Sequence, residues 1–119
     1  MGETILIVDD EPDMLDSIED ALILSRYVVT RARDGQQAWE ILGTESPTII
    51  LSDFQMPRLN GAKLFDLVRG SNRNRKIPFI FMSATPELIT SVGSYTVLRK
   101  PFVFETLIQK VEFSIASRH

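Results

Sequence analysis

Short, unbroken runs of aliphatic residues alternate along the chain with segments whose apolar residues lie three or four positions apart. The runs are typical of strands buried on both faces and predict strands over residues 4–8, 27–32, 48–52, 79–83 and 95–98. The spacing of three or four is the period of a helix and predicts helices over residues 12–25, 34–43, 61–70 and 103–117. Strands that alternate with helices indicate a parallel sheet.

The expected fold is therefore an α/β domain, a doubly wound five-stranded parallel sheet with helices on both faces. The chain of 119 residues is long enough for one domain with one core. It shows no internal repeat, low-complexity segment or interdomain linker. We expect a single domain that covers residues 1–119.

The segment between the fourth and fifth predicted strands is unusually short. Only residues 84–94 are available for two loops and any helix between them. Pro86 favours a helix start and Gly93 a stop, so at most about two turns fit, up to Val92. A fourth helix, placed before the last strand, is expected to be short or absent.

Composition and charge narrow the function classes. The net charge of −3 gives no electrostatic basis for binding nucleic acid directly. The absence of cysteine excludes disulfides, thiolate metal sites and cysteine nucleophiles. No apolar run approaches the roughly 20 residues that cross a bilayer, and the N-terminus does not resemble a signal peptide. We expect a cytoplasmic protein with no membrane contact.

Three carboxylates follow predicted strands: Asp9 and Asp10 after the first, and Asp53 after the third. Because the carboxyl ends of parallel strands meet at one edge of a sheet, we expect them to lie close together. Anions held this close repel one another and must share protons or bind a cation. Hard oxygen ligands of this kind suit Mg²⁺.

Two further strand ends complete this candidate site. Ser83 ends the fourth predicted strand and Lys100 follows the fifth. Phosphoryl transfer requires a nucleophile, a metal ion and a fixed cation for the charge on the moving group. A carboxylate can serve as the nucleophile and form an aspartyl phosphate, and Asp53, near the middle of the edge, is the best candidate.

The chain resembles the receiver domains of two-component response regulators over essentially its whole length. The resemblance rests on several short motifs that occur in the expected order at the strand ends. They are Asp9-Asp10-Glu11, Asp53, Met56-Pro57-Arg58-Leu59-Asn60-Gly61, Ser83-Ala84 and Lys100-Pro101-Phe102. It implies the flavodoxin-like strand order 2-1-3-4-5.

The resemblance also implies a function. Asp53 would accept a phosphoryl group from a sensor histidine kinase or a histidine phosphotransfer protein and control a downstream effector domain or protein. Ser83 would hydrogen-bond the phosphoryl oxygens and Lys100 would neutralise them. The chain would not be an enzyme beyond its own phosphorylation and dephosphorylation, and it would be a monomer or weak dimer.

The same resemblance implies a Mg²⁺ site and a special backbone feature. Asp10, Asp53 and the backbone carbonyl of Gln55 would ligate the ion directly, and Asp9 would act mainly through water. The Lys100-Pro101 peptide bond would be cis and would direct the lysine toward the acceptor.

The sequence departs from the family pattern in two places: the interval from Ser83 to Lys100 is several residues shorter than usual, and one residue of the last strand differs. Receivers usually carry Tyr or Phe three positions before the lysine, where this chain has Val97. Tyr95 lies two positions earlier, on the same face of a strand, and could partly substitute. Val97 therefore keeps open the alternative of a pseudo-receiver that binds partners without phosphorylation.

A true aspartyl-phosphate phosphatase or phosphotransferase is the other alternative. Such enzymes usually need a second carboxylate two residues after the nucleophile, and this chain has Gln55 there. Three further interpretations concern residues outside the site. The basic cluster Arg69, Arg73, Arg75 and Lys76 is read as a solvated loop, Trp39 as partly exposed packing, and the terminal His119 as disordered and without a role.

Overall fold

The computed structural model describes residues 2–56, 58–91 and 93–117. Pro57 of the loop motif, Val92 and His119 lie outside the described residues. The strands are β1 (Thr4–Val8), β2 (Val28–Ala32), β3 (Ile49–Asp53), β4 (Phe79–Ser83) and β5 (Thr96–Arg99). The helices are α1 (Pro12–Leu24), α2 (Gly35–Leu42), α3 (Gly61–Arg69), the 3₁₀ helix η1 (Pro86–Leu88) and α4 (Phe104–Ala116). Among the described residues, no helix has both the length and the apolar character that crossing a membrane requires.

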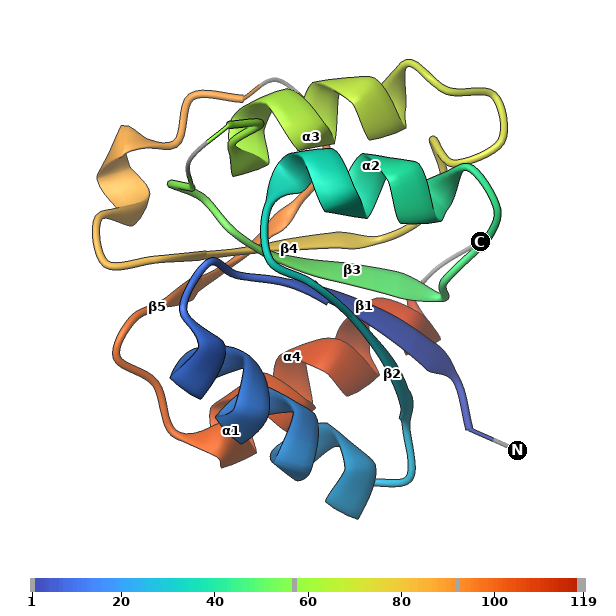
Figure 1. Ribbon diagram of the computed structural model, residues 1–119. Coiled ribbons are helices and arrows are strands. Elements are labelled where there is room, and N and C mark those ends of the chain that lie inside the picture. Colours follow the sequence, from blue (N-terminus) through green and yellow to red (C-terminus); the bar gives the residue numbers. More distant parts are fainter. Residues whose placement is uncertain (1, 57, 92, 118–119) are drawn as a thin grey trace.

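The five strands form one parallel sheet in the order β2-β1-β3-β4-β5. Figure 1 shows α2 and α3 above the sheet and α1 and α4 below it. This is the doubly wound α/β fold expected from the sequence, and the strand order implied by the family resemblance is also confirmed. The element boundaries differ from the expected ones by one residue at most of their ends.

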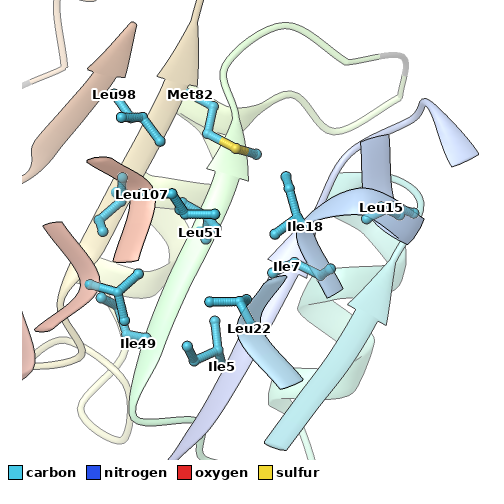
Figure 2. Packing of buried hydrophobic residues seen from close by; sticks show 12 residues of the cluster. Ile5, Ile7, Leu15, Ile18, Leu22, Ile49, Leu51, Met82, Leu98 and Leu107 are labelled. Atoms are coloured by element: carbon cyan, nitrogen blue, oxygen red, sulfur yellow. The ribbon is translucent and has the colours of Figure 1, made fainter. Parts of the chain in front are cut away.

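Aliphatic side chains fill the layer between the sheet and helices α1 and α4 (Figure 2). Ile5 and Ile7 of β1 point into this layer, where they pack with Ile18 and Leu22 of α1. These four side chains are fully buried. Burial of each contributes about 1.5–3 kcal/mol relative to an exposed side chain. The alternation along β1 sends Leu6 and Val8 to the opposite layer, under α2 and α3.

Aromatic rings fill much of the layer under α3. Phe65 of α3 packs edge-on against Phe79, with ring centroids 5.2 Å apart, and lies 5.5 Å from Phe81. Tyr95, directly before β5, packs edge-on against both Phe65 and Phe81 at 5.5 and 5.2 Å. Edge-to-face pairs of this kind add about 0.5–1.5 kcal/mol beyond the area that they bury. They hold the tyrosine ring against the sheet.

The expectation of a short or absent helix before β5 is confirmed for the described residues. Within residues 84–91 and 93–95 the only helical element is η1, Pro86–Leu88. An ion pair between Glu87 and Arg99 links η1 to the last strand. The side of β5 that a longer helix would cover is therefore flanked by a single 3₁₀ turn.

Two arginines of the basic cluster, Arg69 at the end of α3 and Arg73 in the loop that follows, donate to backbone carbonyls. The interpretation as a solvated loop was wrong for Arg69, whereas Arg73 is exposed as expected. Arg69 is half-buried and donates to the carbonyl oxygens of Arg75, Ile77 and Ser94 at 2.8–3.1 Å. Arg73 donates to the carbonyl oxygen of Gly43 at 2.9 Å. Both side chains satisfy backbone acceptors that loop residues leave open, a role that charge spacing in the sequence does not reveal.

Candidate functional site

The sheet register brings the predicted site residues to one edge. Asp53 is the last residue of β3, and Asp9 directly follows β1. Because Val8 pairs with Ser52, Asp9 and Asp53 lie side by side at the ends of neighbouring strands. Ser83 ends β4, and Lys100 directly follows β5. The carboxyl edge of the parallel sheet thus collects these side chains, as expected for a doubly wound fold.

Lys100 lies between two of the carboxylates. Its Nζ donates to Oδ2 of Asp9 and to Oδ1 of Asp53, each at 3.2 Å. Asp9 is fully buried, and its Oδ1 accepts a hydrogen bond from the backbone N–H of Glu11 at 2.9 Å. Both oxygens of Asp9 therefore have partners within the protein, which fixes its orientation.

The third carboxylate, Asp10, is exposed beside this pair. Asp9, Asp10 and Asp53 each offer an oxygen atom, and the three oxygens lie within 4.8 Å of one another. One lysine does not neutralise three carboxylates, so the group has a negative charge at neutral pH. A set of hard oxygen donors that is partly open to solvent fits Mg²⁺, which retains several of its own waters.

Burial and charge shift the titration of this group. Burial, together with the negative charges of Asp9 and Asp10, raises the pKa of Asp53 to about 6, against the opposing attraction of Lys100. Burial lowers the pKa of Lys100, but attraction by Asp53 and Asp9 outweighs it and gives a net increase. At pH 7 and above Asp53 is mostly ionised and Lys100 is protonated.

Ser83 is buried, and its hydroxyl oxygen accepts a hydrogen bond from the backbone N–H of Thr85 at 3.0 Å. A hydroxyl that accepts one hydrogen bond can still donate its own hydrogen to another group. The Ser83 carbonyl accepts from the backbone N–H of Lys100 at 2.8 Å, which ties the ends of β4 and β5 together. The Lys100-Pro101 peptide bond is cis, as the resemblance implied.

The loop after Asp53 is closed by two contacts that the sequence analysis missed. The backbone N–H of Gly61 donates to the carbonyl of Phe54, and a Cβ at position 61 would lie 2.4 Å from the Asp53 carbonyl oxygen. A Cβ at Gly35 would lie 1.9 Å from the Leu59 carbonyl oxygen. Each glycine permits a backbone approach that any side chain would block. In the sequence, the only indication of a special role for Gly35 and Gly61 was that each begins a predicted helix.

A pair of charges outside the acidic group also holds this loop. Asp34, at the N-cap of α2, accepts the N–H of Gln37 at 2.8 Å and is buried. Its second oxygen lies 3.3 Å from Arg58, which has a positive φ of 62°. The pairing of residues 34 and 58 could not be inferred from spacing, because it depends on how the loop folds back.

The remaining predicted positions lie beside the site. Gln55 is exposed, two residues beyond Asp53. Val97 pairs in register with Phe81 of β4, and Tyr95 packs onto the aromatic rings under α3. Tyr95 precedes β5 instead of starting it, which differs from the expected strand over residues 95–98.

The raised pKa of Asp53 predicts a pH-dependent stability difference between the metal-free protein and Asp53→Asn. The folded protein holds this proton up to about pH 6, whereas the unfolded chain releases it near pH 4. Ionisation therefore costs stability as the pH rises from about 4 through 6. At pH 7 without divalent ions, Asp53→Asn should be more stable by about 1–2 kcal/mol, after allowance for solvent screening. Urea unfolding at pH 4 and pH 7 measures this, and a difference that does not grow with pH would contradict it.

The fold and the acidic strand ends define a doubly wound α/β protein with a candidate metal and phosphate site at the carboxyl edge of its sheet. Comparison with known families identifies it further: the response regulator receiver domain matches residues 5–112. The chain belongs to this family, whose members are signalling domains of two-component systems and not classical enzymes.

Curated relatives include both short and long proteins. Chemotaxis protein CheY1 of Helicobacter pylori is 34% identical over 115 residues, which cover 91% of this chain and 93% of that protein. Sensor histidine kinase TmoS of Ectopseudomonas mendocina is 35% identical over 121 residues, which cover 96% of this chain and 12% of the kinase. The chain likewise spans 43% of Response regulator GtcR of Aneurinibacillus migulanus, at 32% identity and with 86% of this chain covered.

Solved structures agree with the fold. The receiver domain of sensor histidine kinase PA1611 from Pseudomonas aeruginosa has a TM-score of 0.91 at 28% identity, covering 98% of this chain and 100% of that one. That structure has a magnesium ion coordinated in its active site cleft. CheY4 of Vibrio cholerae, a chemotaxis response regulator, has a TM-score of 0.90 at 26% identity, covering 96% of this chain and 99% of that one.

Proposed function

We propose that residues 1–119 form one receiver domain that is phosphorylated on Asp53 in a Mg²⁺-dependent reaction. Receiver domains take phosphate from histidine kinases and act on effectors. The donor for this chain is a sensor histidine kinase or a histidine phosphotransfer protein, and the output passes to an effector domain or protein. The cytoplasmic location expected from the sequence stays a prediction.

One observation carries this proposal: Lys100 lies 3.2 Å from both Asp9 and Asp53, inside a group of three carboxylates. A structural salt bridge needs one carboxylate for each lysine, and two carboxylates in excess are unfavourable without a cation. The arrangement combines a nucleophile, a cation site and a fixed positive charge, which are the parts that phosphoryl transfer requires.

Each residue has a step in the proposed reaction. An Asp53 carboxylate oxygen attacks the phosphorus of a phosphohistidine, the P–N bond breaks, and its electron pair returns to the imidazole nitrogen. Lys100 and the Ser83 hydroxyl bind the phosphoryl oxygens as they arrive. Asp10, Asp53 and the Gln55 carbonyl would hold Mg²⁺, with Asp9 acting mainly through water, and the ion would supply positive charge that offsets the charge of the phosphoryl oxygens.

The output route is expected to differ from that of receivers with a full helix before β5. The region between β4 and β5 contains only η1 among its described residues. Val97 stands where the family usually has an aromatic ring, and Tyr95 is packed against Phe65 and Phe81. A dimer formed through this face is therefore not favoured, and we propose that the domain acts as a monomer or weak dimer.

Asp10→Asn should weaken Mg²⁺ binding by at least about tenfold, because it removes one of two proposed carboxylate ligands. Isothermal titration with Mg²⁺ measures the affinity. Asp13→Asn is the matched control, since Asp13 is also acidic and exposed but lies outside the carboxylate group. Equal Mg²⁺ affinity in Asp10→Asn and the control would exclude the proposed ligand set.

The proposal as a whole is tested by phosphorylation with a small donor. Incubation with acetyl phosphate and Mg²⁺ should add one phosphoryl group to the intact mass. Omission of Mg²⁺ should prevent the addition. A protein that binds Mg²⁺ and yet gains no mass under these conditions would favour a phosphorylation-independent pseudo-receiver.

A further inference from the structure

An open groove lies at the opposite end of the sheet from Asp53. It has a volume of about 570 Å³ and is lined by residues at the amino ends of β4 and β5, the C-terminal part of α4 and the loop after α3. Phe79 and Thr96, which begin β4 and β5, both line it. None of its lining residues belongs to the acidic site.

Arg69 lines the groove and connects the segments around it. Its guanidinium donates to the Arg75 and Ile77 carbonyls at 3.1 and 2.9 Å, and to the Ser94 carbonyl at 2.8 Å. It also lies 4.8 Å above the Phe65 ring. These contacts tie the end of α3 to the residues before β4 and before β5. The backbone segments on this side of the groove are thus linked to one another.

Two cations at the groove remain open to a partner. Arg75 and Lys76 are exposed, and among the described residues neither forms an ion pair. The protein as a whole has a net charge of −3. A pair of unpartnered cations beside a groove in an acidic protein favours a ligand with carboxylates.

An apolar contact lies beside these cations. Phe113 of α4 is 71% exposed and lines the groove, whereas its neighbour Ser114 is buried. The rings of Phe79 and Tyr95 already pack against Phe65 and Phe81. Phe113 is therefore the ring that is free to contact a ligand, and an open groove with one free ring suits a peptide better than a stacked base.

We propose that this groove binds a short acidic segment of a partner protein. One apolar side chain of the segment packs on Phe113, and carboxylates on either side pair with Arg75 and Lys76. Aromatic anchors next to cations are typical of the residues that dominate protein interfaces. The site is separate from the phosphoacceptor and needs neither Mg²⁺ nor phosphorylation to bind.

Selection from a displayed library of random short peptides tests the proposal. Wild-type protein should enrich peptides with several acidic residues around one large apolar residue. Amide NMR with a selected peptide should show shifts at Thr96, Phe113 and Ser117. Arg75→Glu with Lys76→Glu should weaken binding roughly tenfold, and Phe113→Ser should weaken it by a similar factor.

The matched control reverses two exposed cations elsewhere, Arg33→Glu with Lys63→Glu, and should leave the affinity within about twofold of wild type. Equal loss in the control would show that only net charge matters and would overturn the proposal. Enrichment of basic peptides, shifts confined to other surfaces, or no enrichment at all would also overturn it. If ATP displaces the peptide and shifts the same amide signals, the groove binds a nucleotide and not an acidic segment, and the proposal is overturned.

Discussion

Lys100→Met should destabilise the metal-free protein by about 2–3 kcal/mol at pH 7, the largest stability effect expected from a single change at the site. The substitution leaves Asp9 fully buried and Asp53 nearly so, without the cation that lies 3.2 Å from each. Removal of one partner from a buried ion pair leaves uncompensated charge, whereas the methionine keeps the apolar length of the side chain. Urea unfolding at pH 7 without divalent ions measures the loss.

Low pH and bound Mg²⁺ should each reduce the destabilisation caused by Lys100→Met, because each weakens the repulsion between the carboxylates. Protonation of Asp53, whose pKa is raised to about 6, removes part of the repulsion at low pH, and a bound cation offsets the repulsion at neutral pH. Lys63→Met is the control, because Lys63 is an exposed lysine outside the carboxylate group, and it should change stability by less than about 0.5 kcal/mol. A Lys100→Met protein as stable as this control at pH 7 would show that the lysine is not coupled to the carboxylates.

The sheet and its carboxyl edge were predictable because they depend on local patterns. An unbroken aliphatic run such as residues 5–8 has few ways to be buried except between two layers of helices. Once the strands are parallel, Asp9, Asp53 and Lys100 must lie at the same edge, whatever the detail of the loops. The short segment before β5 followed from counting residues between Ser83 and Lys100.

The loops and their contacts were not predictable, because they depend on how distant segments meet. The pairing of Arg58 with Asp34 joins two loops 24 residues apart. The close approach of Gly61 to the Asp53 carbonyl depends on the path of the loop between them. Arg69 was read as a solvated residue of a charged run, yet it donates to three backbone carbonyls. The spacing of charges alone does not distinguish a solvated arginine from one that donates hydrogen bonds to the backbone carbonyls of a turn.

Tyr95 shows the same limit at a strand boundary. Alternation places residues 95 and 97 on one face of an extended strand, which suggested that the tyrosine could replace the missing ring at Val97. In the structure β5 begins at Thr96, and the tyrosine ring packs between Phe65 and Phe81. Packing against rings of two different elements, α3 and β4, decides its position, and no local pattern encodes it.

The central claim is that Asp53 is the sole phosphoryl acceptor, and substitution of this residue should have the largest effect on function. Asp53→Asn keeps the shape of the side chain and removes the nucleophilic carboxylate oxygen. Because the pKa of Asp53 is raised to about 6, the reaction should be run at pH 7 or above, where the carboxylate is mostly ionised. Asp13→Asn controls for the loss of one negative charge near the site.

The direct measurement is intact mass after incubation with acetyl phosphate and Mg²⁺. Wild-type protein and Asp13→Asn should each gain one phosphoryl group, and Asp53→Asn should gain none while remaining folded. Equal labelling of wild type and Asp53→Asn would contradict the assignment, as would labelling of wild type when a chelator removes all Mg²⁺ before acetyl phosphate is added.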